Sequence, residues 1–391
     1  MYTTVRQARP ASFGLGPGPR VSTTAMQVLR VPSMDGVVLQ VQDRGVYYPP
    51  SKASSSESAQ SDIQVVTMLL VHANGFHGRV WDPVVECLYA SARTRGRGVR
   101  VLTFDLRAHG GSTVPDSTSS DALKNNLRWD KFADDVFAVV HRVKHTKLNV
   151  NLHVVGHSLG AHAAIRAEAR APGTFRSIYA FEPIFMVDAK KDLPSGGEFV
   201  FSPDLRKAAS KRKERFESKA KALQVFKSKP PMNAFHDKAL ESYVEFGFVV
   251  DTEDTNESKN ENEKRASSVC LAMSRKNEAL VFSNGGEERT VDFLLRSDDG
   301  KQRSLVSCPT TVVRGSTEAA HDKTYVPYPS AIAPVVASVI GTNARLETHS
   351  EWNHFGPLCD PKGFVESVWE HVGRSEGDDS RALHKATRAR L

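Results

Sequence analysis

Residues 152–160 contain the feature that most constrains this chain. Here Gly156-His157-Ser158-Leu159-Gly160 lies between an apolar, strand-like run and an alanine-rich, helix-like run. Such a segment forms a sharp strand-to-helix turn that requires both glycines, because larger side chains would collide there. The turn lifts the serine hydroxyl above the sheet and aims the Leu159 N–H and the helix N-terminus at the same point. We therefore predict that Ser158 is a nucleophile and that Leu159 is one oxyanion donor.

Strand-like and helix-like segments alternate around this turn. The run 65–71 is apolar throughout, as expected of a strand buried on both faces. Further strand-like runs are 28–31, 37–41, 99–104, 148–155, 177–181, 310–313 and a short one near Leu346, and helix-like segments are 81–93, 129–143, 159–171, 331–340 and 363–372. This alternation predicts an α/β fold, with a mostly parallel central sheet flanked by helices.

The alternation is interrupted once, by a polar, basic and helical stretch. We predict that residues 186–307 form an inserted, mainly helical cap, and that residues 26–185 and 308–373 form the core. Residues 1–25 contain several Gly and Pro and are expected to be a disordered lead-in. Residues 374–391 are expected to be a flexible tail.

The second oxyanion donor is expected in the loop after strand 65–71, which reads His72-Ala73-Asn74-Gly75-Phe76-His77. Gly75 allows the backbone to turn inward, so the main-chain N–H of the next residue, Phe76, is the candidate. His72 and His77 are expected to shape the loop. The alternative interpretation is an ordinary Asn-Gly turn.

The general base should follow the nucleophile late in the chain. His354 lies between the last short strand and the last helix, which is where a base loop is expected. His371 falls inside the last helix, and His321 follows a strand too closely to reach back. Geometry therefore favours His354.

The triad acid is less constrained by the sequence. Glu182 directly follows strand 177–181, whereas Glu318 and Asp322 follow the later strand 310–313. The later strand is the commoner position in this kind of fold, but the usual Asp is missing there. We favour Glu182 and keep Glu318 as the alternative acid. An exposed loop carboxylate is the competing interpretation of each.

Two further groups of residues are expected near the pocket. Asp105 and Arg107 are interpreted as structural charges that hold a loop, and His109 as a residue at the pocket mouth. Apolar walls could come from cap aromatics, which could equally be the core of the cap: Phe216, Phe226, Phe235, Tyr243 and Phe246.

Composition narrows the partners. The net charge is +7, but no aromatic-studded basic stripe accompanies it, so nucleic-acid binding is not expected and the basic run 206–229 is interpreted as a solvated helix face. No apolar run is long enough to span a bilayer, and residues 1–19 lack a secretory apolar core. The four cysteines fit no metal or disulfide pattern, which favours a reducing compartment.

The sequence finishes with Ala389-Arg390-Leu391, a near variant of the Ser-Lys-Leu peroxisomal address. We expect a peroxisomal location and recognition by the import receptor. A chance tail and a cytoplasmic location are the alternative.

These residues together resemble the α/β-hydrolase superfamily. The cap and loop segments 208–213, 227–231, 240–247 and 72–77 are similar to a fungal subgroup that includes a yeast peroxisomal lipase and hydrolases of toxin pathways. In that subgroup the acid often precedes a proline, as in Glu182-Pro183, and the later strand ends near Gly-Ser, as in Gly315-Ser316. The long polar stretch 251–264 departs from the subgroup, as does the absence of its usual His-Leu after the base-loop glycine.

The resemblance implies ester or thioester hydrolysis of an apolar acyl substrate by Ser158, His354 and Glu182. No cofactor or metal is implied. An acyltransferase with the same triad, or a non-catalytic binder with this fold, are the alternatives, and fold alone does not separate them.

Overall fold

The computed structural model describes residues 26–49, 65–115, 119–144, 151–193, 203–251, 268–285, 290–298, 301–316 and 327–377. Within these ranges eight strands form one sheet, in the order β1-β2-β4-β3-β5-β6-β12-β13. Their bounds are β1 Gln27–Pro32, β2 Val38–Tyr47, β3 Val65–Val71, β4 Gly98–Phe104, β5 Leu152–His157, β6 Ser177–Phe181, β12 Thr310–Gly315 and β13 Ala344–His349. Only the pairs β1–β2 and β2–β4 are antiparallel, so the predicted mostly parallel sheet is confirmed.

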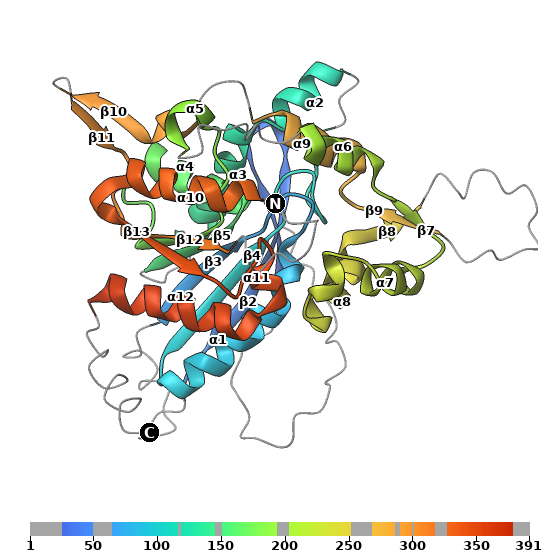
Figure 1. The fold of residues 1–391 in the computed structure, drawn as a ribbon. Helices are drawn as coiled ribbons and strands as arrows, with labels where there is room; N and C mark the ends of the chain where they lie inside the picture. Colours follow the sequence, from blue (N-terminus) through green and yellow to red (C-terminus); the bar gives the residue numbers. More distant parts are fainter. Residues whose placement is uncertain are drawn as a thin grey trace, which may run out of the picture.

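Helices cover both faces of the sheet (Figure 1). One face packs against α1 (Asp82–Arg95) and α12 (Pro361–Glu376), and the other against α3 (Trp129–Lys144), α4 (Leu159–Arg170) and α10 (Pro327–Ile340). Shorter helices are α2 (Ser120–Asn126) and α11 (Gly356–Cys359), with 3-10 turns η1 (Met34–Gly36), η3 (Gly78–Trp81) and η6 (Gly341–Asn343).

Strand β3 shows why the central run is apolar without alternation. Leu69 and Val71 belong to the buried cluster on the α3–α4 side, whereas Met68 and Leu70 belong to the cluster on the α1–α12 side. Successive side chains of a strand point to opposite faces, and here helices cover both faces. An apolar residue is therefore needed at nearly every position.

A separate unit lies over the edge of the sheet at which the parallel strands end (Figure 1). It contains α6 (Pro203–Lys211), α7 (Lys219–Lys227), η4 (Met232–Ala234), α8 (Asp237–Gly247) and α9 (Arg275–Ser283). It also contains the antiparallel strands β7 (Arg215–Phe216), β9 (Val269–Leu271) and β8 (Phe248–Val250). The short helix α5 (Ala189–Asp192) precedes it. We call residues 203–285 the cap.

The predicted cap of residues 186–307 extended too far toward its C-terminal end. Turn η5 (Thr290–Leu294) packs against α4 and α10, and β10 (Leu295–Asp298) pairs with β11 (Lys301–Ser304) on the far side of the core from α7 and α8 (Figure 1). Val291 and Leu294 are fully buried there. Their apolar side chains return this segment to the core, and we propose that the cap ends near residue 285.

The two ends of this insertion meet. Thr290 accepts a hydrogen bond from the Met186 N–H at 2.7 Å, and the Val291 N–H donates to the Met186 carbonyl at 3.4 Å. The chain therefore leaves the core and returns to it at neighbouring positions.

Some predicted features lie outside the described residues: the lead-in 1–25, the tail beyond residue 377 with Ala389, Arg390 and Leu391, and most of the polar stretch 251–264. Of the helices that are described, none combines the length and the apolar character needed to cross a bilayer.

Candidate active site

Ser158 occupies the sharp turn that the sequence predicted. It stands between β5 and α4 with φ 54° and ψ −113°, and its N–H donates to the Phe181 carbonyl at 2.9 Å. A Cβ on Gly156 would come within 2.5 Å of the Ala161 Cα, and a Cβ on Gly160 would overlap the carbonyl oxygen of Val71. Both flanking positions therefore require glycine for close approach of backbone to backbone.

Glu182 lies directly after β6, the strand that pairs with β5, and its side chain is fully buried. Its Oε2 is 2.8 Å from Nδ1 of His354. Its Oε1 accepts the Gly315 N–H at 2.8 Å and the Ser330 hydroxyl. The structure thus brings together the favoured acid and the favoured base, although they are far apart in the chain.

The tautomer of His354 follows from these contacts. An ionised carboxylate only accepts hydrogen bonds, so Nδ1 of His354 donates and Nε2 carries the lone pair. The base loop is held from behind, since the Nε2–H of His157 donates to the His354 carbonyl at 2.8 Å and Ser316 N–H donates to the Trp352 carbonyl at 2.9 Å. Burial, and then the neighbouring His354, lower the pKa of His157 well below its ordinary value, so His157 stays neutral.

Ser158 and His354 line the same cavity. Among the hydrogen bonds of the described residues, none joins the Ser158 hydroxyl to the His354 ring. Hydrogen bonds of this kind are often long in ligand-free structures and shorten in the complex with substrate.

The predicted oxyanion donor Phe76 is corrected by the structure. Its N–H donates to the Ala73 carbonyl at 3.2 Å, and the Gly75 N–H donates to Nε2 of His109 at 3.1 Å. The Asn74 N–H has no acceptor within the described ranges, and Asn74 lines the cavity. Leu159 begins α4, where first-turn amides have no intrahelical acceptor. The available amides are therefore those of Asn74 and Leu159.

The Asn74-Gly75 pair in the sequence could have predicted that the Phe76 N–H is not available. Asn-Gly occupies the two central positions of a four-residue turn, in which the fourth residue donates to the carbonyl of the first. Gly75 occupies the third position with φ 79°, and the Phe76 N–H, at the fourth position, forms the hydrogen bond that closes the turn.

The sequence analysis placed His109 at the pocket mouth, but the residue is fully buried beneath this loop. Its Nδ1–H donates to the Arg107 carbonyl at 2.8 Å, which leaves Nε2 free to accept from Gly75. Burial lowers the pKa of His109 to about 4, so the ring remains a neutral acceptor. His72 lies alongside and is also buried; its Nδ1–H donates to the Ala73 carbonyl at 2.8 Å. Both histidines thus support the oxyanion loop from inside the core.

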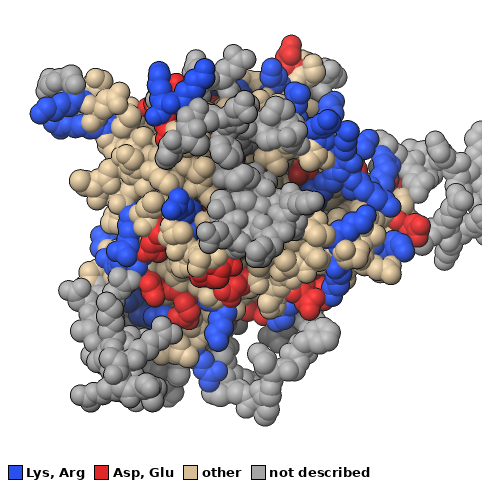
Figure 2. Space-filling model, viewed as in Figure 1, with Lys and Arg blue, Asp and Glu red and all other residues tan. Residues whose placement is uncertain are grey.

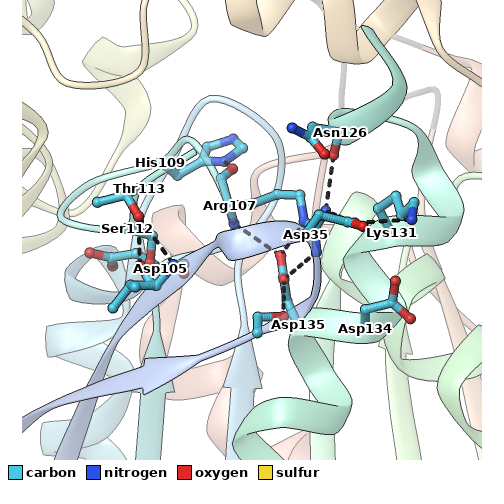
Figure 3. A network of polar contacts seen from close by, with 12 residues as sticks. Asp35, Asp105, Arg107, His109, Ser112, Thr113, Asn126, Lys131, Asp134 and Asp135 are labelled. Carbon is cyan, nitrogen blue, oxygen red and sulfur yellow. Dashed lines mark hydrogen bonds and ion pairs between the residues drawn. The ribbon is translucent and has the colours of Figure 1, made fainter. Parts of the chain in front are cut away.

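A polar network below His109 fixes the neighbouring loop (Figure 3). The Arg107 Nη2 and Nε atoms lie 2.7 Å and 2.9 Å from the two carboxylate oxygens of Asp135 on α3, and both side chains are fully buried. Asp105 accepts the main-chain N–H groups of Gly78 at 2.7 Å and Gly111 at 2.8 Å. These contacts are structural, as the sequence suggested for Asp105 and Arg107.

The cavity between core and cap has a volume of about 460 Å³. Of the predicted aromatic walls, Phe216, Phe226 and Phe235 line it. Tyr243 instead stacks on His77 in the interior, and Phe246 lies outside beneath Arg79. The site therefore joins a serine, a histidine–carboxylate pair and two available amides to an apolar chamber.

Of the competing candidates, His371 lies among the described residues and does not reach this site. His371 is buried in α12, between Thr311 and Ser177. Glu318, Asp322 and His321 lie outside the described residues. Within the part of the chain that is described, no three His, Cys, Asp or Glu side chains are grouped so that they could hold a metal ion.

Comparison with known proteins agrees with this architecture. A sequence profile described as "Alpha/beta hydrolase family" matches residues 68–253. The structure has the α/β-hydrolase fold. No curated protein sequence matches it.

Several solved structures share this fold at low sequence identity. E-2-(Acetamidomethylene)succinate hydrolase is 16% identical with a TM-score of 0.59, over 89% of this chain and 99% of that one. The peroxisomal α/β-hydrolase Lpx1 of Saccharomyces cerevisiae is also 16% identical with a TM-score of 0.59, over 95% and 89%. The thioesterase domain of the curacin biosynthetic pathway is 14% identical with a TM-score of 0.57, over 89% and 100%.

Proposed function

We propose that this chain is a serine hydrolase that cleaves carboxylic ester or thioester bonds of an apolar acyl substrate. The observation that carries the proposal is the 2.8 Å contact between Nδ1 of His354 and the buried Glu182 carboxylate, at the cavity that Ser158 lines. A buried carboxylate orients the imidazole and stabilises its charged form. Nε2 of His354 can then act as the base that takes the Ser158 proton.

In the proposed reaction Nε2 of His354 takes the Ser158 proton as Oγ attacks the acyl carbonyl carbon. The Leu159 and Asn74 N–H groups stabilise the oxyanion of the tetrahedral intermediate. The imidazolium then donates its proton to the departing alkoxide or thiolate, and an acyl-enzyme remains. Water, deprotonated by the same histidine, releases the acid and regenerates Ser158. Glu182 stays ionised throughout.

The substrate class rests on the walls of the cavity. Phe216, Phe226 and Phe235 offer an apolar surface to an acyl chain, and hydrophobic contact is the main source of affinity for such a group. Fold neighbours that are named as thioesterase and esterase carry out reactions of this class.

A peroxisomal location remains a prediction from the sequence. It rests on Ala389-Arg390-Leu391, and one fold neighbour is named as peroxisomal. A fluorescent fusion with and without Leu391 tests it: peroxisomal puncta that are lost with Leu391 support the prediction, and a diffuse signal from both supports the cytoplasmic alternative.

Hydrolysis of p-nitrophenyl esters of increasing acyl length tests the proposed function. We expect turnover that Ser158→Ala abolishes, with an optimal chain length set by the cavity. Product analysis with an added alcohol separates hydrolysis from acyl transfer. Equal rates for wild type and Ser158→Ala would contradict the proposal.

A further inference from the structure

The cavity that Ser158 lines is apolar but has cationic groups in its wall. Arg212, Lys213 and Lys229 all contribute to the lining. Arg212 is neutralised by Glu278, whose Oε2 is 2.8 Å from its Nη1. Lys213 and Lys229 are exposed, and neither forms an ion pair with a carboxylate of the described residues. Two uncompensated positive charges therefore face the cavity.

Two other lysines of the basic run provide a contrast. On α7, the Lys219 Nζ is 3.2 Å from Glu245, and the Lys227 Nζ is 2.9 Å from Asp237. These lysines form ordinary surface ion pairs, which contribute little to stability. Lys213 instead places its ammonium 4.7 Å from the centroid of the Phe216 ring, and that ring is itself a cavity wall.

The charge of the whole chain is concentrated here. Residues 206–229 contain ten Lys and Arg but only two Asp and Glu, a net charge of +8, whereas the complete chain carries +7. Figure 2 shows these side chains gathered over α6 and α7, on the cap side of the molecule. A local excess of one sign at a cleft attracts ligands of the opposite sign and orients them as they approach. Three members of this run, Arg212, Lys213 and Lys229, line the cavity.

We propose that the substrate of this site is an acyl compound that carries an anionic group, a phosphate or a carboxylate, held by the ammonium groups of Lys213 and Lys229. The apolar part of the substrate lies against Phe216, Phe226 and Phe235. This inference rests on the proposed function for the reacting bond, but it concerns a different part of the substrate. The anion belongs either to the leaving group or to the far end of the acyl chain.

Three thioesters of the same chain length separate these sources. Hexanoyl-N-acetylcysteamine is uncharged, hexanoyl-coenzyme A carries phosphates on the leaving group, and adipoyl-N-acetylcysteamine carries a carboxylate at the end of the acyl chain. Binding of each to Ser158→Ala protein is measured by calorimetry, so the result does not depend on turnover. The same series is then repeated after Lys213→Gln and Lys229→Gln are added together.

We expect one anionic thioester to bind more tightly than the neutral one, and the double lysine change to weaken that ligand by roughly 5- to 30-fold. Binding of hexanoyl-N-acetylcysteamine should change less than about 2-fold. Raising the salt concentration to about 1 M should also remove most of the difference, because it shortens the screening length to about 3 Å. The preferred anionic ligand identifies the source of the charge.

The matched control is the double change Lys301→Gln and Lys362→Gln. Both lysines are exposed and lie outside the cavity, and their replacement removes the same charge. It should leave all three affinities unchanged. Equal binding of neutral and anionic thioesters, or equal losses in the control and the cavity variant, would overturn the inference. If the wild-type protein hydrolyses the neutral thioester in that case, the proposed function survives the failure of the inference.

Discussion

Ser158 and Glu182 both have a positive φ angle, 54° and 45°, which residues with a side chain adopt at a cost of about 1–3 kcal/mol each. Each is held by a main-chain bond to the neighbouring strand: Ser158 N–H to Phe181, and Glu182 N–H to Val313 at 2.7 Å. The strained conformations direct the hydroxyl and the carboxylate away from their own strands. Two adjacent strand ends thereby present both groups on the same edge of the sheet.

The first prediction concerns the acid. Glu182→Gln keeps the shape of the side chain but removes the charge that stabilises the His354 imidazolium, so kcat should fall by about 10²–10⁴ with little change in KM. Ester hydrolysis measured beside Glu318→Gln checks this. Loss in Glu318→Gln with activity retained in Glu182→Gln would transfer the role of the acid to Glu318.

At this scale the sequence was informative where short-range geometry decides the position. The two glycines around Ser158 predicted the turn that the structure shows, and the place of His354 before the last helix pointed to the residue that contacts Glu182. The sequence favoured Glu182 but left Glu318 open, because the partners of the Glu182 carboxylate, Gly315 and Ser330, lie more than 130 residues away in the chain. No local pattern reports such contacts.

At the scale of elements, the cap is attached to the oxyanion loop. The Arg212–Glu278 ion pair joins α9 to the end of α6, and the Glu278 carbonyl accepts the Asn74 side-chain amide at 3.3 Å. A Cβ on Gly75 would come within 2.6 Å of the Glu278 carboxylate. His77 donates to the Tyr243 carbonyl on α8 at 3.1 Å. The loop that supplies the Asn74 amide is thus braced by the core on one side and the cap on the other.

The second prediction follows from that attachment. Glu278→Gln leaves the largely buried Arg212 charge without its counter-ion, so we expect a loss of about 1–3 kcal/mol in the free energy of unfolding. Urea denaturation measures it. Glu86→Gln is the control, since its ion pair with Lys238 is more than half exposed and should cost less than about 0.5 kcal/mol. Similar losses in both variants would contradict a bracing role for Glu278.

Element boundaries show a second limit of sequence reasoning. The spacing of apolar residues located the strands and helices of the core. The polar stretch after residue 185 has no alternation of strand-like and helix-like segments, so its whole length was assigned to the cap. Val291 and Leu294 are short apolar signals in that stretch, and only their burial against α4 and α10 returns them to the core.

At the scale of the whole molecule, the core buries several histidines in neutral form. Burial lowers the pKa of His371 and of His162 to about 3 and that of His109 to about 4. The ordinary pKa of about 6.5 applies in the unfolded chain. As the pH falls below 6.5, the unfolded chain binds protons that the folded chain does not, so the free energy of unfolding decreases.

The third prediction uses His371, which lies away from the site between Thr311 and Ser177. His371→Gln should reduce the slope of the free energy of unfolding between pH 6 and pH 4 by about 1.4 kcal/mol per pH unit. Its stability at neutral pH should also fall. An unchanged slope in His371→Gln would show that His371 becomes protonated in the folded protein.

The central claim is that Ser158 is an activated nucleophile, and covalent labelling tests it most directly. Purified protein is treated with a fluorophosphonate, digested, and the modified peptide is identified by mass spectrometry. We predict a single adduct on Ser158, absent from Ser158→Ala and formed at least about 100-fold more slowly in His354→Ala, whose base is missing. An unlabelled Ser158 in folded wild-type protein, or a rate that is unaffected by His354→Ala, would contradict the account.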